Sequence, residues 1–243
     1  MKSPLIGINI NVSYFESSEC QTHYKDEYQI RISYVDCVYK AGGIPVLVPC
    51  FEDENMLRQY MQRVDGFLFI GGADYPPEFY NESLHQETKV LPKRRSSVDI
   101  MLVKLALSKQ IPILGICAGI QLINIASGGK LIQHLPTVRD HGPREDGTDN
   151  EHETKITGGK ILKDLFGTRQ ILVNSGHHQG VDPKFVGSRL QVVAQAENGV
   201  VEAIESVDER FLLGVQWHPE RIRDIDHQKK IFDAFVKASA YKK

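Results

Sequence analysis

The chain has 243 residues, and its 29 Lys and Arg against 31 Asp and Glu give a formal net charge of −2. This balance, without a basic block, argues against nucleic acid or an anionic membrane as a partner. No apolar run approaches the roughly 20 residues that a transmembrane helix requires.

The cysteines and the start of the chain indicate the compartment. Residues 1–4 lead directly into a short apolar run and lack the long apolar core of a signal peptide. The four cysteines show no close paired spacing, so we expect neither a disulfide framework nor a zinc site. We therefore expect a cytoplasmic protein, with no cofactor and no bound metal.

Short apolar runs alternate with helix-like stretches in the first half of the chain. The apolar runs predict strands at residues 5–10, 44–48, 66–70 and 113–116. The stretches between them predict helices at residues 27–41, 55–63, 97–109 and 118–127. This alternation predicts a mostly parallel sheet covered by helices on both faces.

Caps and apolar stripes define the helices more closely. Asp53 and Ser96 are the predicted N-caps of the second and third helices, and Gly42 ends the first. The face of the first helix is predicted to carry Tyr28, Ile32, Val35 and Tyr39.

The second half is less regular. Residues 133–150 are polar and predict a long loop, and residues 161–166 predict a short helix. Strands are predicted at residues 170–173, 190–196, 200–206 and 211–216. Asn198-Gly199 is a good tight-turn pair and predicts a β-hairpin. The closing helix, residues 225–238, has a predicted buried stripe of Ile231, Phe232, Phe235 and Val236.

These elements predict an α/β fold of three layers. Its mostly parallel central sheet has helices on both faces, and an antiparallel hairpin region is added at its edge. We find no linker, repeat or low-complexity segment. We therefore expect one domain spanning residues 1–243.

The most informative motif surrounds Cys117. An apolar strand runs into this cysteine, Gly115 and Gly119 flank it, and a helix-like stretch begins at once. This is the cysteine form of a nucleophile elbow, in which glycines allow a sharp turn that exposes the thiol. A helix N-terminus also favours the thiolate. The alternative is a buried structural cysteine between two turn glycines.

A second strand ends in titratable groups near the C-terminus. His218 can act as a base, and Glu220 can hold one of its ring nitrogens while the other faces Cys117. Pro219 fixes the backbone φ between them. By itself such a pair is typical of a surface ion pair, but beside a cysteine elbow we interpret it as a catalytic dyad.

The motif Gly-x-Cys-x-Gly-x-Gln at residues 115–121, followed by Gln-Trp-His-Pro-Glu at 216–220, resembles the class I glutamine amidotransferase domain. Four further stretches, at residues 41–49, 71–74, 173–179 and 199–205, resemble the peptidase-like branch that contains γ-glutamyl-γ-aminobutyrate hydrolase. The resemblance spans roughly residues 4–237.

The resemblance implies a flavodoxin-like fold and a set of site residues. The implied catalytic triad is Cys117, His218 and Glu220. The implied oxyanion donors are the N–H groups of Gly72 and Ala118, although Gly71-Gly72 can also be a plain strand-to-loop turn. The implied substrate-binding residues are Gln121, His178 and Gln179.

The implied reaction is hydrolysis of a γ-glutamyl amide through a γ-glutamyl thioester, with release of glutamate and an amine. Many γ-glutamyl hydrolases of this branch carry arginine directly after the nucleophile, where this chain has Ala118. The backbone donor remains, but a guanidinium contact to a carboxylate on the leaving amine is lost.

The remaining histidines and cysteines have simpler interpretations. His177-His178 can be a capped loop or a metal pair, and we expect no metal because no other ligand has regular spacing with it. We expect His134 and His141 to be solvated or structural. The expected packing residues or surface thiols are Cys20, Cys37 and Cys50.

Two other functions stay open: a glutaminase subunit that supplies ammonia to a separate synthase, and a binding relative that kept the fold without catalysis. We expect a small-molecule substrate, no nucleic acid and no membrane partner, and a homodimer is allowed. The leaving amine, the oligomeric state and a lid role for residues 133–150 stay open.

Overall fold

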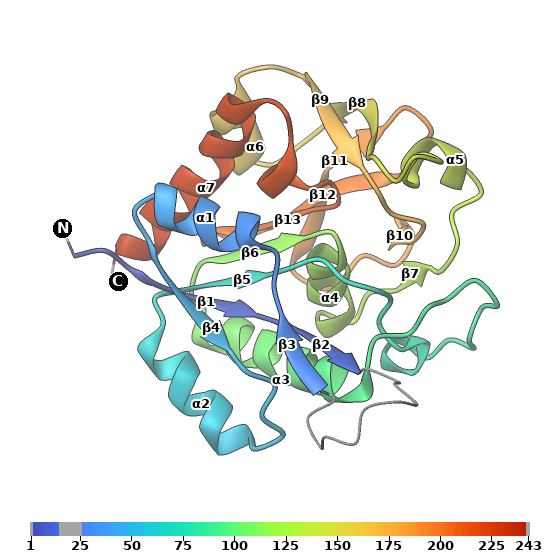
Figure 1. The fold of residues 1–243 in the computed structure, drawn as a ribbon. Coiled ribbons are helices and arrows are strands. Elements are labelled where there is room, and N and C mark those ends of the chain that lie inside the picture. Colours follow the sequence, from blue (N-terminus) through green and yellow to red (C-terminus); the bar gives the residue numbers. More distant parts are fainter. Residues whose placement is uncertain (1, 15–25, 242–243) are drawn as a thin grey trace.

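Within residues 2–14 and 26–241, which the computed structural model describes, nine strands form one central sheet in the order β4-β1-β5-β6-β13-β12-β11-β8-β9 (Figure 1). The parallel strands are β4 (Ile44–Val48), β1 (Leu5–Asn9), β5 (Gly66–Phe69), β6 (Ile113–Ile116) and β13 (Leu212–Val215). The antiparallel strands are β12 (Val201–Ser206), β11 (Leu190–Ala196), β8 (Asn150–Ile156) and β9 (Gln170–Ser175).

Helices cover both faces of this sheet, which confirms the predicted three-layer α/β fold (Figure 1). One face carries α1 (Ile32–Lys40), α6 (Ile161–Phe166) and α7 (Ile225–Ala240). The other carries α2 (Glu54–Arg63), α3 (Lys93–Lys109) and α4 (Ala118–Ala126). In the described part of the chain, every helix is too short or too polar to traverse a lipid bilayer.

Smaller elements lie outside the central sheet. β2 (Asn11–Tyr14) pairs with β3 (Asp26–Gln29), and β7 (Leu131–Ile132) pairs with β10 (Gly180–Val181). One helical turn, α5 (Val138–His141), lies between β7 and β8. Two 3₁₀ turns, η1 (Pro77–Tyr80) and η2 (Pro219–Arg221), follow β5 and β13.

Several local predictions are confirmed. The Asp53 side chain accepts hydrogen bonds from the N–H groups of Asn55 and Met56 and so caps α2. Gly199 adopts φ 83° in the turn between β11 and β12, as a tight hairpin turn requires. The predicted stripe of α7 is buried: Ile231, Phe232, Phe235 and Val236.

The predicted helix at residues 27–41 is wrong in its first part and in its face. Residues 26–29 are strand β3, in which Tyr28 pairs with Val12 of β2. Counting Tyr28 as helical gave the apolar stripe the wrong phase, so Ile32 and Tyr39 are 74% and 70% exposed. The buried face of α1 carries Tyr34, Cys37 and Val38 instead.

Two further predictions need correction. Ser96 does not cap α3, because the helix begins after Pro92 and Ser96 lies within it. The predicted loop at residues 133–150 contains α5 and ends where β8 starts. Strand β8 was missed because its sequence is mostly polar, although it pairs with β9 on one side and β11 on the other.

The sheet order decides where the candidate site residues gather. Strands β5, β6 and β13 are parallel neighbours, with β6 in the middle. Gly71, Cys117 and His218 follow the carboxyl ends of these three strands. Because parallel strands end at the same edge, these residues meet there, where open α/β sheets bind their ligands.

Helix α4 approaches this edge closely because its second residue, Gly119, has no side chain. A Cβ atom built on Gly119 would lie 2.2 Å from the Phe69 carbonyl oxygen. One built on Gly115 would lie 2.8 Å from the Gly119 carbonyl. Both positions therefore exclude a side chain.

Gly119→Ala should reduce the free energy of unfolding by about 1–3 kcal/mol, because the added methyl group must push α4 off β5. The matched control is Gly158→Ala, whose Cβ would lie 3.5 Å from the nearest atom, the Val192 oxygen. Urea denaturation of the two variants and the parent checks this, and equal midpoints for all three proteins would contradict it.

Candidate active site

Cys117 occupies a strained backbone conformation between β6 and α4. Its φ of 54° and ψ of −107° are rare for a residue with a side chain. The Cys117 N–H donates to the Val215 carbonyl at 2.8 Å, which ties the turn to β13. The residue is 6% exposed, and it both packs with the core on its side of the sheet and lines a pocket.

His218 and Glu220 form a buried pair beside Cys117. His218 Nδ1 lies 2.8 Å from Glu220 Oε1, and the two residues are 6% and 2% exposed. The His218 backbone N–H donates to Asn174 Oδ1 at 3.2 Å, which anchors the turn to β9. The pair is therefore not a surface ion pair.

The electrostatic environment keeps His218 charged. Burial disfavours the imidazolium ion, but the Glu220 carboxylate and the charge and hydrogen bond of Cys117 outweigh it. Together they raise the pKa of His218 from 6.5 to about 10. The ring therefore holds a proton between the cysteine and the carboxylate at neutral pH.

The Gly71-Gly72 loop after β5 is held from two sides. The Gly71 N–H donates to the Tyr34 hydroxyl at 3.1 Å, and Arg95 Nη2 donates to the Gly71 carbonyl at 3.0 Å. A Cβ atom on Gly72 would lie 2.4 Å from Arg95 Nη1. A side chain at Gly72 would therefore have to displace the buried Arg95 guanidinium that holds the loop.

A buried carboxylate, Asp99 of α3, holds Arg95 in place. Asp99 accepts hydrogen bonds from Arg95 Nε at 3.1 Å, the Tyr75 hydroxyl at 2.7 Å and Asn9 Nδ2 at 2.9 Å. Asn9 in turn accepts from the Ile70 N–H at 2.8 Å. This network joins β1, α3 and the end of β5 beneath the candidate site.

A pocket of about 160 Å³ opens at Cys117. It contains all three predicted substrate-binding residues, and its lining is Gly72, Ala73, Asp74, Lys89, Cys117, Gln121, Gly176, His177, His178 and Gln179. His178 Nε2 lies 3.0 Å from Asp74 Oδ2, so a hydrogen-bonded histidine–aspartate pair forms part of the wall.

The two pocket glutamines differ in whether their side-chain amides are free to bind a ligand. Gln121 Nε2 donates to the Gln179 carbonyl at 3.3 Å and to Gln216 Oε1 at 3.2 Å, so it binds the wall together. Within the described residues, the side-chain amide of Gln179 has no hydrogen-bond partner although it is buried. Its donor and acceptor are available to a ligand.

Sequence reasoning missed the roles of Asp74, Asn174, Arg95 and Asp99. Asp74 and Asn174 lie inside motifs already singled out, so their positions carried a signal. Arg95 and Asp99 stand four apart on a helix, a spacing typical of an exposed ion pair. Nothing local showed that this pair is buried under the loop after β5.

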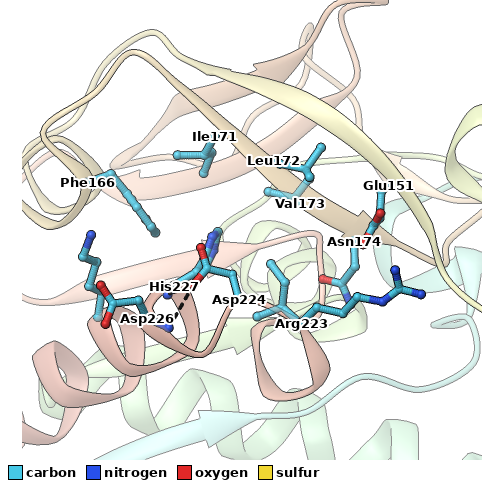
Figure 2. Close-up of a pocket in the computed structure, with 12 residues that line it drawn as sticks. Glu151, Phe166, Ile171, Leu172, Val173, Asn174, Arg223, Asp224, Asp226 and His227 are labelled. Carbon is cyan, nitrogen blue, oxygen red and sulfur yellow. Dashed lines mark hydrogen bonds between the residues drawn. The ribbon is translucent and has the colours of Figure 1, made fainter.

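A second pocket, of about 450 Å³, lies between β9 and the start of α7 (Figure 2). Phe166, Ile171 and His227 line it, and it contains no cysteine. Asn174 also lines this second pocket, and its Oδ1 accepts a hydrogen bond from the His218 N–H. The second pocket therefore adjoins the turn that carries His218. It offers no thiol, so the candidate active site is assigned to the pocket at Cys117.

Burial narrows the expectation that His134 and His141 are solvated or structural. His134 is half-buried and lies 3.4 Å from His178, ring nitrogen to ring nitrogen. His141 is 1% exposed, so it is not solvated. The fold gathers His141, His152, His177 and Glu202 into one cluster that could hold a metal ion, although their sequence spacing is irregular.

Comparisons with known proteins show which family the sequence matches. A profile of the family described as peptidase C26 matches residues 4–220. A glutamine amidotransferase-like protein of Rickettsia prowazekii is 32% identical, over 99% of both chains. The γ-glutamyl-γ-aminobutyrate hydrolase of Escherichia coli K12 is 30% identical, over 98% of this chain and 94% of that protein.

A solved structure confirms the fold independently. The glutaminase domain of the Trypanosoma brucei CTPS superposes with a TM-score of 0.64 at 15% identity, over 99% of this chain and 95% of that one. The chain belongs to the peptidase C26 family, within the class I glutamine amidotransferase-like proteins. It is a glutamine amidotransferase-like hydrolase.

His218 should stay protonated through neutral pH and titrate near pH 10, because its pKa is raised to about 10 in the folded chain. Its charge therefore stabilises the fold fully below about pH 6.5, and this contribution is lost as the pH rises to about 10. NMR titration of the imidazole checks this. Glu220→Gln should lower the pKa of His218, whereas the control Glu197→Gln changes an exposed residue and should leave that pKa unchanged. An unchanged His218 pKa in Glu220→Gln would contradict the role assigned to Glu220.

Iodoacetamide should alkylate Cys117 before Cys37 or Cys50. Burial, with the charges of Glu220 and Asp99 respectively, raises the pKa of each of those two thiols to about 12. Their thiolates are therefore scarce at mildly alkaline pH. Peptide mass spectrometry over a time course measures the order, and earlier labelling of Cys37 or Cys50 would contradict it.

Proposed function

We propose that the protein is a cysteine-dependent hydrolase of γ-glutamyl amides, acting on γ-glutamyl-amine or γ-glutamyl-amino-acid conjugates. The observation that carries this proposal is the strained Cys117 at the start of α4, adjoining His218 and its partner Glu220. A nucleophile, a proton carrier and an orienting carboxylate are the parts that acyl transfer needs.

In the first half-reaction, the Cys117 thiolate attacks the γ-carbonyl carbon of the substrate. The tetrahedral intermediate collapses when His218 gives its proton to the leaving nitrogen, and the amine departs from a γ-glutamyl thioester. The raised pKa of His218, about 10, supports this role because the proton is present at neutral pH.

In the second half-reaction, neutral His218 takes a proton from water, and the resulting hydroxide attacks the thioester carbonyl. Glutamate leaves, and the thiolate and imidazolium are restored. Glu220 orients the His218 ring through its 2.8 Å contact with Nδ1 and stabilises its charge.

The oxyanion of each intermediate needs preorganised N–H donors. The Ala118 N–H begins α4 and has no partner within the helix, so it can point at the oxyanion. The Gly72 N–H is the second proposed donor. The clamp of Tyr34 and Arg95 on Gly71 supports this choice, because it holds the loop rigid before the substrate arrives.

The pocket supports a small, doubly charged head group such as a glutamyl unit. The Asp74 carboxylate, paired with His178, suits an α-ammonium group. The free amide of Gln179 can bind either the α-amino or the α-carboxylate group. Gln121 holds the Gln179 backbone in place, and a volume of about 160 Å³ suits the glutamyl unit better than a whole peptide.

The decisive experiment measures glutamate release from glutamine, γ-glutamyl-γ-aminobutyrate, γ-glutamyl-putrescine and several γ-glutamyl dipeptides. The parent should turn over conjugates faster than glutamine. Cys117→Ala should lose at least a thousandfold in kcat, since the covalent route disappears. The matched control, Cys50→Ala, alters a buried thiol outside the pocket that donates to the Ile10 carbonyl, and it should keep its activity.

The outcomes separate the competing functions. Cys117-dependent turnover of glutamine alone would favour a glutaminase subunit that supplies ammonia to a separate synthase. Binding without turnover would favour a non-catalytic relative. Parent-like rates in Cys117→Ala would exclude the proposed mechanism.

A further inference from the structure

Four buried side chains from separate parts of the chain converge beside the pocket. His141 ends α5, His152 lies in β8, His177 follows β9, and Glu202 lies in β12. One ring nitrogen of each histidine and a Glu202 oxygen lie within 4.8 Å of one another. None of these atoms belongs to the Cys117, His218 and Glu220 arrangement.

The converging atoms lack hydrogen-bond partners within the described residues. These atoms are His141 Nδ1, His152 Nε2, His177 Nε2 and both carboxylate oxygens of Glu202. The Glu202 side chain is 0% exposed, and those of His141 and His177 are 1% and 2% exposed. Unpaired buried polar atoms are costly, so a cluster of them indicates a missing partner.

The outer ring nitrogen of His177 shows how that ring is protonated. His177 Nδ1 lies 2.8 Å from the Gln179 carbonyl. A carbonyl only accepts, so Nδ1 carries the hydrogen. In a neutral imidazole, Nε2 then presents a lone pair, which faces the Glu202 carboxylate. His152 Nδ1 is held between the Glu153 carbonyl at 3.3 Å and the Thr154 hydroxyl at 3.4 Å, which orients its Nε2 toward the cluster.

The third histidine is held through its opposite nitrogen, by a side-chain amide that offers both a donor and an acceptor. His141 Nε2 lies 3.0 Å from Asn198 Nδ2 and 3.3 Å from Asn198 Oδ1, and this contact leaves Nδ1 aimed at the cluster. Metal-ligating histidines are commonly oriented by such a contact on their other nitrogen.

The spacing within the cluster suits a central ion better than direct hydrogen bonds. Glu202 Oε1 lies 3.4 Å from His141 Nδ1, 3.5 Å from His152 Nε2 and 3.7 Å from His177 Nε2. These separations exceed the usual N–H···O range of about 2.7–3.2 Å. Bond lengths of about 2.0–2.2 Å around tetrahedral zinc place neighbouring ligand atoms about 3.4 Å apart.

We propose that His141, His152, His177 and Glu202 bind one divalent transition-metal ion of the zinc type in a four-coordinate N₃O site. Three imidazoles and a carboxylate suit zinc, whereas calcium and magnesium prefer oxygen ligands alone. Four protein ligands leave no open position at a tetrahedral ion, so the site is structural rather than catalytic.

The ion would fasten the wall of the neighbouring pocket. The His177 N–H already donates to the His141 carbonyl at 2.8 Å, and Ser175 Oγ donates to the same oxygen at 2.9 Å. His177 is followed directly by His178 and Gln179, which line the pocket. A metal at this cluster therefore joins α5, β8 and β12 to the segment that bears these side chains.

The first test uses the parent protein and does not depend on activity. Purified in metal-free buffers and supplied with equimolar zinc, it should retain one ion per chain by plasma mass spectrometry. Anomalous scattering from a crystal should place that ion among the four side chains. Removal by a strong chelator should lower Tm by several degrees, and zinc should restore it.

Variants assign the ion to its ligands. His152→Ala changes the most exposed of the four, at 15%, and should abolish stoichiometric metal retention while the chain stays folded. Glu202→Gln should do the same. His134→Ala removes another half-buried histidine outside the cluster and should retain the ion.

Cobalt provides a second readout should Glu202→Gln fail to fold. The parent loaded with Co²⁺ should show the intense visible absorption of a four-coordinate ion, and His152→Ala should not. Absence of tight binding of zinc and cobalt by the parent, or full retention by His152→Ala, would overturn the proposal and leave the cluster as a metal-free polar network.

Discussion

The close approach of α4 to the sheet is the constraint on which the candidate site depends. Gly119 packs against the Phe69 carbonyl, and Gly115 packs against Gly119. The chain must therefore turn within one residue between β6 and α4. That residue is Cys117, and the turn imposes its positive φ. Strain of this kind persists only where the surrounding packing enforces it. Here the packing of two glycines places the thiol at the start of a helix, where the helix dipole favours a negative charge.

Buried charge then sets the position of the loop opposite the thiol. Arg95 and Asp99 are fully buried, and such a pair adds little net stability because both ions lose their hydration. Its visible effect is geometric: Asp99 fixes the guanidinium, and the guanidinium fixes the Gly71 carbonyl. Tyr34 completes this clamp from α1. The two faces of the sheet thus meet at one loop, which explains why polar residues interrupt otherwise apolar layers.

The wall formed by residues 176–179 is shared between the pocket and the histidine cluster. On one side Gln121 donates to the Gln179 carbonyl, and on the other His177 donates to the same oxygen. A single backbone carbonyl therefore links the helix after the elbow to the proposed metal site. This arrangement gives the antiparallel half of the sheet a role, because β8, β9 and β12 carry or adjoin the residues that hold the wall.

Local patterns in the sequence determined the strands that lead into the site and the position of the turn at Cys117, because glycine placement and apolar runs are short-range signals. The expectation that His218 and Glu220 join Cys117 came instead from the base that a thiol nucleophile needs and from the resemblance of two distant motifs. Strand β8 was not predicted, because pairing with strands on both sides stabilises it and its own residues are mostly polar. The histidine cluster could not be predicted from the sequence either, because its members lie on separate elements without regular spacing. Only tertiary structure decides which distant side chains share a buried volume, because burial and hydrogen-bond partners are properties of the packed chain and not of any one segment.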